Sequence, residues 1–158
     1  MDLRTTRRRG FVGRWVTLGL VGLVTLQALA ADLKLEAKLI WGTDDEKSPN
    51  PAHKPVDKET AEKLRKIFKW KHYFVVNRQV KNVPSRGSNR FDLSDKCTIE
   101  ITELEGPRVE VMVIGEGKAV NKTTKNLSKG ESFTIGGDDK NNSAWFVIIT
   151  ELDEKAPK

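Results

Sequence analysis

Short segments in which apolar and polar side chains alternate with a period of two recur along most of this chain. Residues 97–104 and 108–114 both follow this pattern, and the turn formers Glu105, Gly106 and Pro107 lie between them. A period of two places successive side chains on opposite faces of an extended strand. The two segments therefore predict an antiparallel hairpin.

Alternation, aromatic and β-branched residues, or apolar runs predict further strands on both sides of this hairpin. They cover residues 33–41, 70–77, 79–83, 89–93, 119–125, 132–135 and 144–152. Turn-forming residues separate them at intervals of roughly 8–12 residues, which is typical of a mainly β domain. We predict an antiparallel β-sandwich, or an open barrel, of about eight short strands. The last segment is nearly continuous in apolar residues, so we expect it in the centre of a sheet.

One segment departs from the β pattern. Ala61 and Leu64 lie at helical spacing, and Asp57 can cap the first turn before them. We expect a short helix from Asp57 to about Ile67 that lies against one edge or end of a sheet. The proline-rich residues 42–55 before it predict an extended surface loop.

The N-terminal segment has the pattern of an export signal. Five arginines and one acid precede the uncharged residues 15–31, and an A-x-A site ends at Ala30. We predict that residues 1–30 are a signal peptide, cleaved between Ala30 and Ala31. An uncleaved anchor helix is the alternative, because about 17 apolar residues is the lower limit for a bilayer span. An arginine pair also fits a twin-arginine signal, which leaves the export route open.

Removal of this segment changes the charge of the protein. The full chain of 158 residues carries +6, but residues 1–30 hold five of its arginines and one aspartate, so the remaining 128 residues are near +2. We therefore expect no nucleic-acid partner, no membrane span after cleavage, and a location in the periplasm or outside the cell. Residues 31–153 are expected to form a single β-sandwich domain and residues 154–158 a polar tail.

Side chains that support catalysis are few. A nucleophile needs a base beside it, most often histidine, and the predicted mature chain contains only His53 and His72, neither in a known catalytic motif. We interpret both as structural or solvated residues. Cys97 is the only cysteine, and its strand position predicts a buried apolar residue, with an intermolecular disulfide or a reactive thiol as alternatives. We therefore predict no catalytic residue and a protein that is not an enzyme.

A turn at residues 136–143 gathers oxygen donors. Asp138, Asp139 and Asn141 supply the hard oxygen atoms that calcium prefers, and short acidic loops on extracellular β domains often bind it. The spacing matches no EF-hand, and the same residue types also form turns. We expect no cofactor, with calcium at this turn as the alternative.

Aromatic side chains are the remaining candidates, because exposed Trp and Tyr commonly contact sugars and partner proteins. Trp41, Trp70 and Trp145 fall on apolar faces or runs of their strands, which favours core packing. Tyr73 shares a face with polar residues and is the best candidate for an exposed contact. The predicted ligand-binding residues are Tyr73, Trp70 and Trp145.

Five segments together resemble one group of bacterial proteins. They are LIWGT at residues 39–43, KPVD at 54–57, FKWKHYFVVN at 68–77, DKCTIEI at 95–101 and AWFV at 144–147. They look like small, uncharacterised exported β-domain proteins of environmental bacteria such as Verrucomicrobia and Planctomycetes. The resemblance implies a compact exported β domain, and it implies no site residues because that group has no assigned activity.

The leading functional prediction is an exported, non-catalytic binding module of the cell envelope, whose partner is a protein or a glycan. Binding residues concentrate on loops held by a rigid scaffold, so the loops at residues 42–56 and 136–143 and the sheet edges are the expected contact surface. The alternative is a structural or assembly accessory that pairs an exposed edge strand with its partner. An enzyme is the third hypothesis.

Overall fold

A computed structural model describes residues 31–153, so the predicted signal peptide, its cleavage after Ala30 and the predicted tail at residues 154–158 lie outside the described range. Nine strands and one helix form within it. They are β1 (Leu33–Thr43), β2 (Lys54–Pro55), α1 (Lys58–Ile67), β3 (His72–Val83), β4 (Ser88–Ser94), β5 (Cys97–Glu103), β6 (Arg108–Gly115), β7 (Lys118–Asn126), β8 (Ser132–Asp138) and β9 (Ala144–Glu151). No helix in residues 31–153 is long and apolar enough to cross a membrane.

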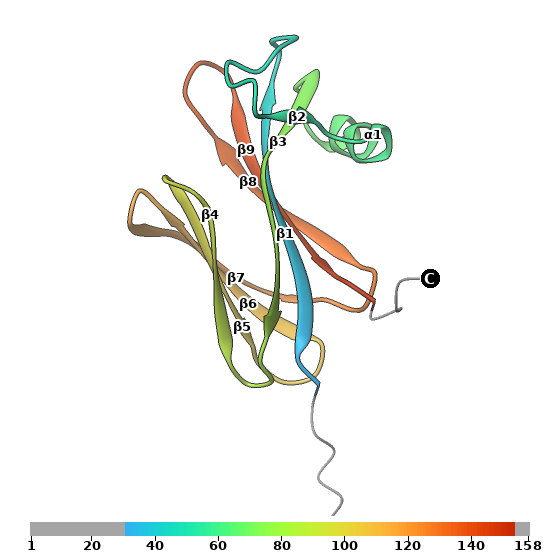
Figure 1. The fold of residues 1–158 in the computed structure, drawn as a ribbon, viewed down its shortest axis with the longest axis vertical. Coiled ribbons are helices and arrows are strands. Elements are labelled where there is room, and N and C mark those ends of the chain that lie inside the picture. The colour runs from blue at the N-terminus through green and yellow to red at the C-terminus, as the bar shows by residue number, and fades with distance from the viewer. Residues whose placement is uncertain (1–30, 154–158) are drawn as a thin grey trace, which may run out of the picture.

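The strands form two antiparallel sheets that face each other (Figure 1). One sheet has five strands in the order β2-β3-β1-β9-β8, and the other has four in the order β4-β5-β6-β7. This arrangement confirms the prediction of a mainly β, antiparallel sandwich with one short helix. Strand β9 lies between β1 and β8, which confirms its predicted place inside a sheet.

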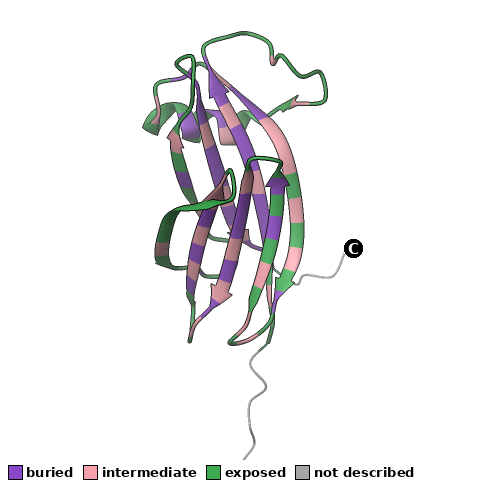
Figure 2. Cartoon of the chain, turned by 90° about the vertical axis from the view of Figure 1, so that its left-hand side faces the viewer, coloured by how far each residue is buried: buried purple, intermediate pink, exposed green. Residues whose placement is uncertain are grey.

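The main core fills the space between the sheets. In the predicted hairpin of β5 and β6, Ile99 lies opposite Val113 and Ile101 lies opposite Val111. All four side chains are buried, whereas residues between them on the same strands are more exposed (Figure 2). The period-two alternation of the sequence therefore becomes one inward and one outward face on these strands.

A second, smaller core lies on the outer face of the five-stranded sheet, beneath α1 (Figure 1). Asp57 caps the helix, because its side chain accepts a hydrogen bond from the Thr60 N–H at 2.8 Å. Leu64 packs from α1 against Phe146 and other apolar residues of the sheet. The helix is confirmed over residues 58–67, and it covers part of a sheet face.

The predicted break between strands at residues 70–77 and 79–83 is wrong, because β3 is continuous. Leu39 of β1 pairs with Asn77, whereas the next residue, Ile40, pairs with Val75. Val76 is therefore the extra residue of a β-bulge. A bulge shifts the phase of the side-chain alternation, which made the segment look like two strands.

Strands β3 and β4 join the two sheets along one side. The Asn77 side chain donates to the Leu93 carbonyl at 3.0 Å, and the Gln79 side chain donates to the Asp92 carbonyl at 2.6 Å. These side chains therefore form hydrogen bonds with backbone carbonyl groups on the edge of β4. Figure 1 shows the sheets close together at the end where β3 turns into β4, and wider apart toward the opposite end.

Candidate ligand-binding cleft

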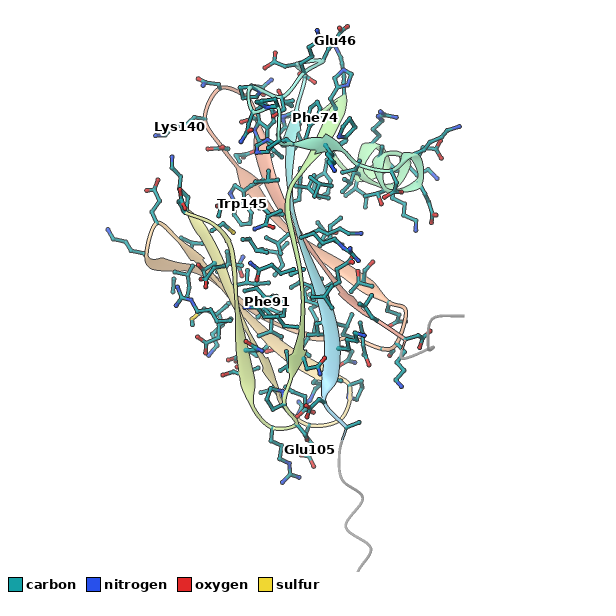
Figure 3. All side chains as sticks on the ribbon, in the orientation of Figure 1. Glu46, Phe74, Phe91, Glu105, Lys140 and Trp145 are labelled. Atoms are coloured by element: carbon teal, nitrogen blue, oxygen red, sulfur yellow. The ribbon has the colours of Figure 1, made fainter. Side chains whose placement is uncertain are left out.

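A cleft of about 640 Å³ opens between the sheets at the end where they spread apart. Its walls are apolar and come from both sheets. They include Trp41, Val76 and Trp145 of the five-stranded sheet and Cys97, Val113 and Val120 of the four-stranded sheet. Figure 3 shows Trp145 between the sheets, above the buried Phe91. Its volume falls within the range of small-molecule sites, and most of its lining is apolar.

Two tryptophans form one wall of this cleft. Trp41 and Trp145 are directly opposite each other in the pairing of β1 with β9, so their side chains share a face of the sheet. Both indoles are only half-buried. Trp41 also lies near Phe74, with 6.1 Å between ring centroids. The cleft therefore presents two adjacent aromatic rings that the protein core does not fully cover.

Glycine makes room for one of these rings. Gly137 of β8 pairs with Trp145, and a Cβ atom at position 137 would lie 2.8 Å from Cζ2 of the indole. Any larger residue would displace the ring, so Gly137 permits its present position.

Polar residues surround the mouth of the cleft. They come from the turns at that end of the sandwich and include His53, Ser94, Lys96, Glu116, Asp138 and Asp139. The loops at residues 42–56 and 136–143, predicted as contact surface, thus both contribute to one site. The polar residues lie at the rim and the apolar residues form the walls.

The turn between β8 and β9 is held by contacts to the segment before β3. The Trp70 Nε1–H donates to the Asn142 carbonyl at 2.7 Å, and the Lys69 ammonium donates to Asn142 Oδ1 at 3.0 Å. Asn141 and Asn142 both have positive φ, at 58° and 55°. Asparagine adopts this left-handed conformation more readily than most residues, so these positions are explained by the turn itself.

The three predicted ligand-binding aromatics separate in the structure. Trp145 lies in the cleft. Trp70 and Tyr73 are buried in the core beneath α1, with exposed fractions of 7 % and 3 %. The prediction that Tyr73 is exposed is therefore wrong. Tyr73 lies near the start of β3 on the outer face of its sheet. The sequence pattern placed polar residues on that face, which suggested exposure, but α1 covers this part of it.

The predicted calcium residues also separate. Asp138 and Asp139 line the mouth of the cleft, whereas Asn141 is outside its lining. Within residues 31–153 no group of three or more His, Cys, Asp or Glu side chains is arranged to hold a metal ion. Calcium at this turn stays a prediction.

Cys97 and His53 both line the cleft, although the sequence predicted a buried packing residue at Cys97 and a solvated loop residue at His53. Cys97 is partly buried, and burial raises the pKa of its thiol, so the thiol is less readily ionised than a free one. His53 Nδ1 lies 2.8 Å from Ser48 Oγ. Among residues 31–153 no carboxylate is hydrogen-bonded to His53, so the pair lacks the third group of a catalytic triad.

Sequence reasoning missed most of the cleft walls. Trp41 was assigned to the core, and Val76, Val113 and Val120 were read only as strand residues. No local signal marks them, because the cleft depends on how far apart the sheets lie. The only sequence signal for this site was that turn segments gather at one end of a sandwich. This signal predicted the contributions of the loops at residues 42–56 and 136–143.

Comparison of the chain with models of protein families, with curated proteins and with solved structures found no match.

Proposed function

We propose that this protein is an exported, non-catalytic binding module that takes a small, largely apolar ligand into the cleft between its sheets. The observation that carries the proposal is the apolar cleft of about 640 Å³ with Trp41 and Trp145 on one wall. The N-terminal signal pattern supports a role outside the cytoplasm.

The apolar surface exposed in the cleft supports the proposal of a ligand. Protein interiors are normally packed as densely as organic crystals. Here, two half-buried indoles and the partly buried Val76 line a cleft that opens to solvent, although closer packing of the sheets would remove their surface from water. An apolar ligand of matching size would recover this hydrophobic free energy.

The lining favours an apolar ligand over a glycan. Sugars need many hydrogen-bond partners along with an aromatic platform, and the cleft offers polar groups only at its rim. The inner walls have aliphatic and aromatic side chains, which suit a hydrocarbon or ring system. The proposal therefore replaces the glycan partner expected from the sequence with a smaller and less polar molecule.

The test uses N-phenyl-1-naphthylamine, an uncharged apolar dye whose fluorescence rises in apolar sites. We expect the purified protein to bind one dye molecule. Val120→Trp should abolish binding, because Val120 lines the cleft and is 57 % exposed, so a larger side chain fills the cleft without disturbing the core. Ile67→Trp is the matched control, because Ile67 is 72 % exposed and lines a separate pocket beside α1, so loss of the dye in this variant instead would place it at that pocket.

Cys97 gives an independent readout. It is the only cysteine of the chain and lies in the cleft wall, so alkylation of its thiol reports directly on the site. Bound dye should slow alkylation by iodoacetamide several-fold. Equal dye binding by the Val120→Trp and Ile67→Trp variants, or no protection of Cys97, would show that the ligand does not enter the cleft.

An assembly role is the second candidate, and the edge strand β7 favours it. Eight of its nine residues are exposed, and no strand pairs with its outer edge within the described residues (Figure 2). Lys118, Lys122 and Lys125 argue against it, because lysines on an edge strand commonly prevent pairing with other chains. A partner that adds a strand to the outer edge of β7 would still bind when N-phenyl-1-naphthylamine saturates the cleft and would not displace the dye, which distinguishes the two functions.

A further inference from the structure

We infer that the cleft selects ligands that carry a cationic group at one end of an apolar body. This inference rests on the proposed function, since it concerns the charge of the ligand that the cleft takes. Two features of the cleft support it, namely the charges at the rim and the two tryptophans next to them.

Carboxylates outnumber ammonium groups in the lining. Glu116, Asp138 and Asp139 line the cleft, whereas Lys96 is the only lysine or arginine that does so. None of these three carboxylates forms an ion pair within residues 31–153. The lining itself therefore carries a net negative charge, which favours cations over anions.

The tryptophans favour a cation at the same place. Trp145 pairs with Gly137, the residue just before Asp138 and Asp139, and Trp41 lies opposite Trp145 on β1. An aromatic face attracts an organic cation within about 6 Å of its centroid, and tryptophan does so most strongly. A ligand whose apolar body fills the cleft would thus place its cationic end between the indoles and the rim carboxylates.

The contact that Asp139 makes in the turn allows a substitution that removes only its charge. Its Oδ1 accepts a hydrogen bond from the Lys140 N–H at 2.8 Å, which an asparagine side chain can also accept. The negative charge of Asp139 is therefore not needed for this contact. Replacement by asparagine removes the charge and keeps the turn.

The test compares three ligands with the same ten-carbon chain, each used below its micelle concentration. They are decyltrimethylammonium, 1-decanol and decanoate, and each competes with N-phenyl-1-naphthylamine for the purified protein. We expect the cationic ligand to displace the dye at about tenfold lower concentration than decanoate, with decanol between them. The preference should weaken as the salt concentration rises, because exposed charges are screened within about 10 Å at 0.1 M salt.

Variants that remove rim carboxylates test whether these charges cause the preference for the cationic ligand. The double variant Asp138→Asn with Asp139→Asn should bring the three ligands within about twofold to threefold of each other. Glu105→Gln is the matched control, because Glu105 is exposed at the opposite end of the sandwich (Figure 3), and it should keep the full preference.

The outcomes separate the inference from the proposed function. If the dye binds but decanoate competes as well as the cation, the cleft binds apolar ligands without regard to charge and the inference is wrong. An unchanged preference in the double variant also overturns it. If neither the dye nor any of the three ligands binds, the proposed function itself fails.

Discussion

At the scale of single residues, Tyr73 is buried through the packing of its ring, without a hydrogen bond from its hydroxyl group. The ring packs near Phe146, with centroids 5.9 Å apart, but its buried hydroxyl has no hydrogen-bond partner in the described structure. Burial raises the pKa of this hydroxyl, so it stays protonated at neutral pH. An unsatisfied buried polar group lowers stability, because it loses its hydrogen bonds to water.

Tyr73→Phe should therefore leave the free energy of unfolding unchanged or increase it by up to about 1 kcal/mol. Tyr73→Ala removes the ring and should cost about 3–5 kcal/mol. Urea unfolding followed by tryptophan fluorescence gives both values. A loss of more than about 1 kcal/mol in Tyr73→Phe would show that the hydroxyl makes a stabilising hydrogen bond, for example to a bound water.

At the scale of secondary structure, local patterns predicted the elements well because they reflect local rules. Alternation identified β5 and β6, a nearly continuous apolar run identified β9, and the cap at Asp57 identified the start of α1. The faces of β3 were less predictable, since the bulge at Val76 depends on the pairing with β1. The residues that form the walls of the cleft could not be predicted, because the distance between the two sheets depends on contacts between residues far apart in the sequence.

The cap of α1 allows a prediction at this scale. Asp57 accepts hydrogen bonds from the Thr60 N–H and hydroxyl, and both bonds hold the pKa of its carboxyl below the usual value. Asp57→Ala should lower the free energy of unfolding by about 1 kcal/mol. Because the folded-state pKa is lowered, this difference is present above the unfolded pKa and is lost as pH falls through the folded one.

Urea unfolding at several pH values measures this loss, and Glu62→Ala, an exposed change in the middle of the same helix, is the control. Dye binding in the cleft should be unaffected, because α1 covers the opposite face of the five-stranded sheet. A weakened dye site in Asp57→Ala would mean that the helix and the cleft are coupled through that sheet.

At the scale of the whole molecule, the two sheets have different roles. The five-stranded sheet packs against the other sheet on one face and is partly covered by α1 on the other, whereas the four-stranded sheet buries one face only. The five-stranded sheet carries Trp41 and Trp145, and the four-stranded sheet supplies the more exposed wall at Val120. We expect the tryptophan wall to be the rigid side of the cleft and the β6–β7 side to adjust to a ligand.

Two buried glutamates on the five-stranded sheet are expected to have opposite effects on how pH changes the stability of the domain. Burial by itself would raise the pKa of Glu36, but hydrogen bonds from Lys38 and Arg78 lower it below the usual value. The stability from Glu36 is therefore present above its unfolded pKa and lost as pH falls through its folded pKa. Glu151 differs, because burial raises its pKa. Its charged form is disfavoured in the fold, so the domain gains stability as pH falls through the folded pKa of Glu151.

The matched variants Glu36→Gln and Glu151→Gln separate these contributions in urea unfolding between neutral pH and about pH 3. Glu36→Gln should lose about 1–2 kcal/mol at neutral pH, where its charged hydrogen bonds are intact, and approach the unmodified protein in acid. Glu151→Gln should be more stable than the unmodified protein at neutral pH, and this gain should vanish in acid, where Glu151 itself is protonated. Parallel pH curves for the two variants would contradict the placement of Glu36 beside two cations and of Glu151 in a buried position near the acidic Asp153 and Glu131.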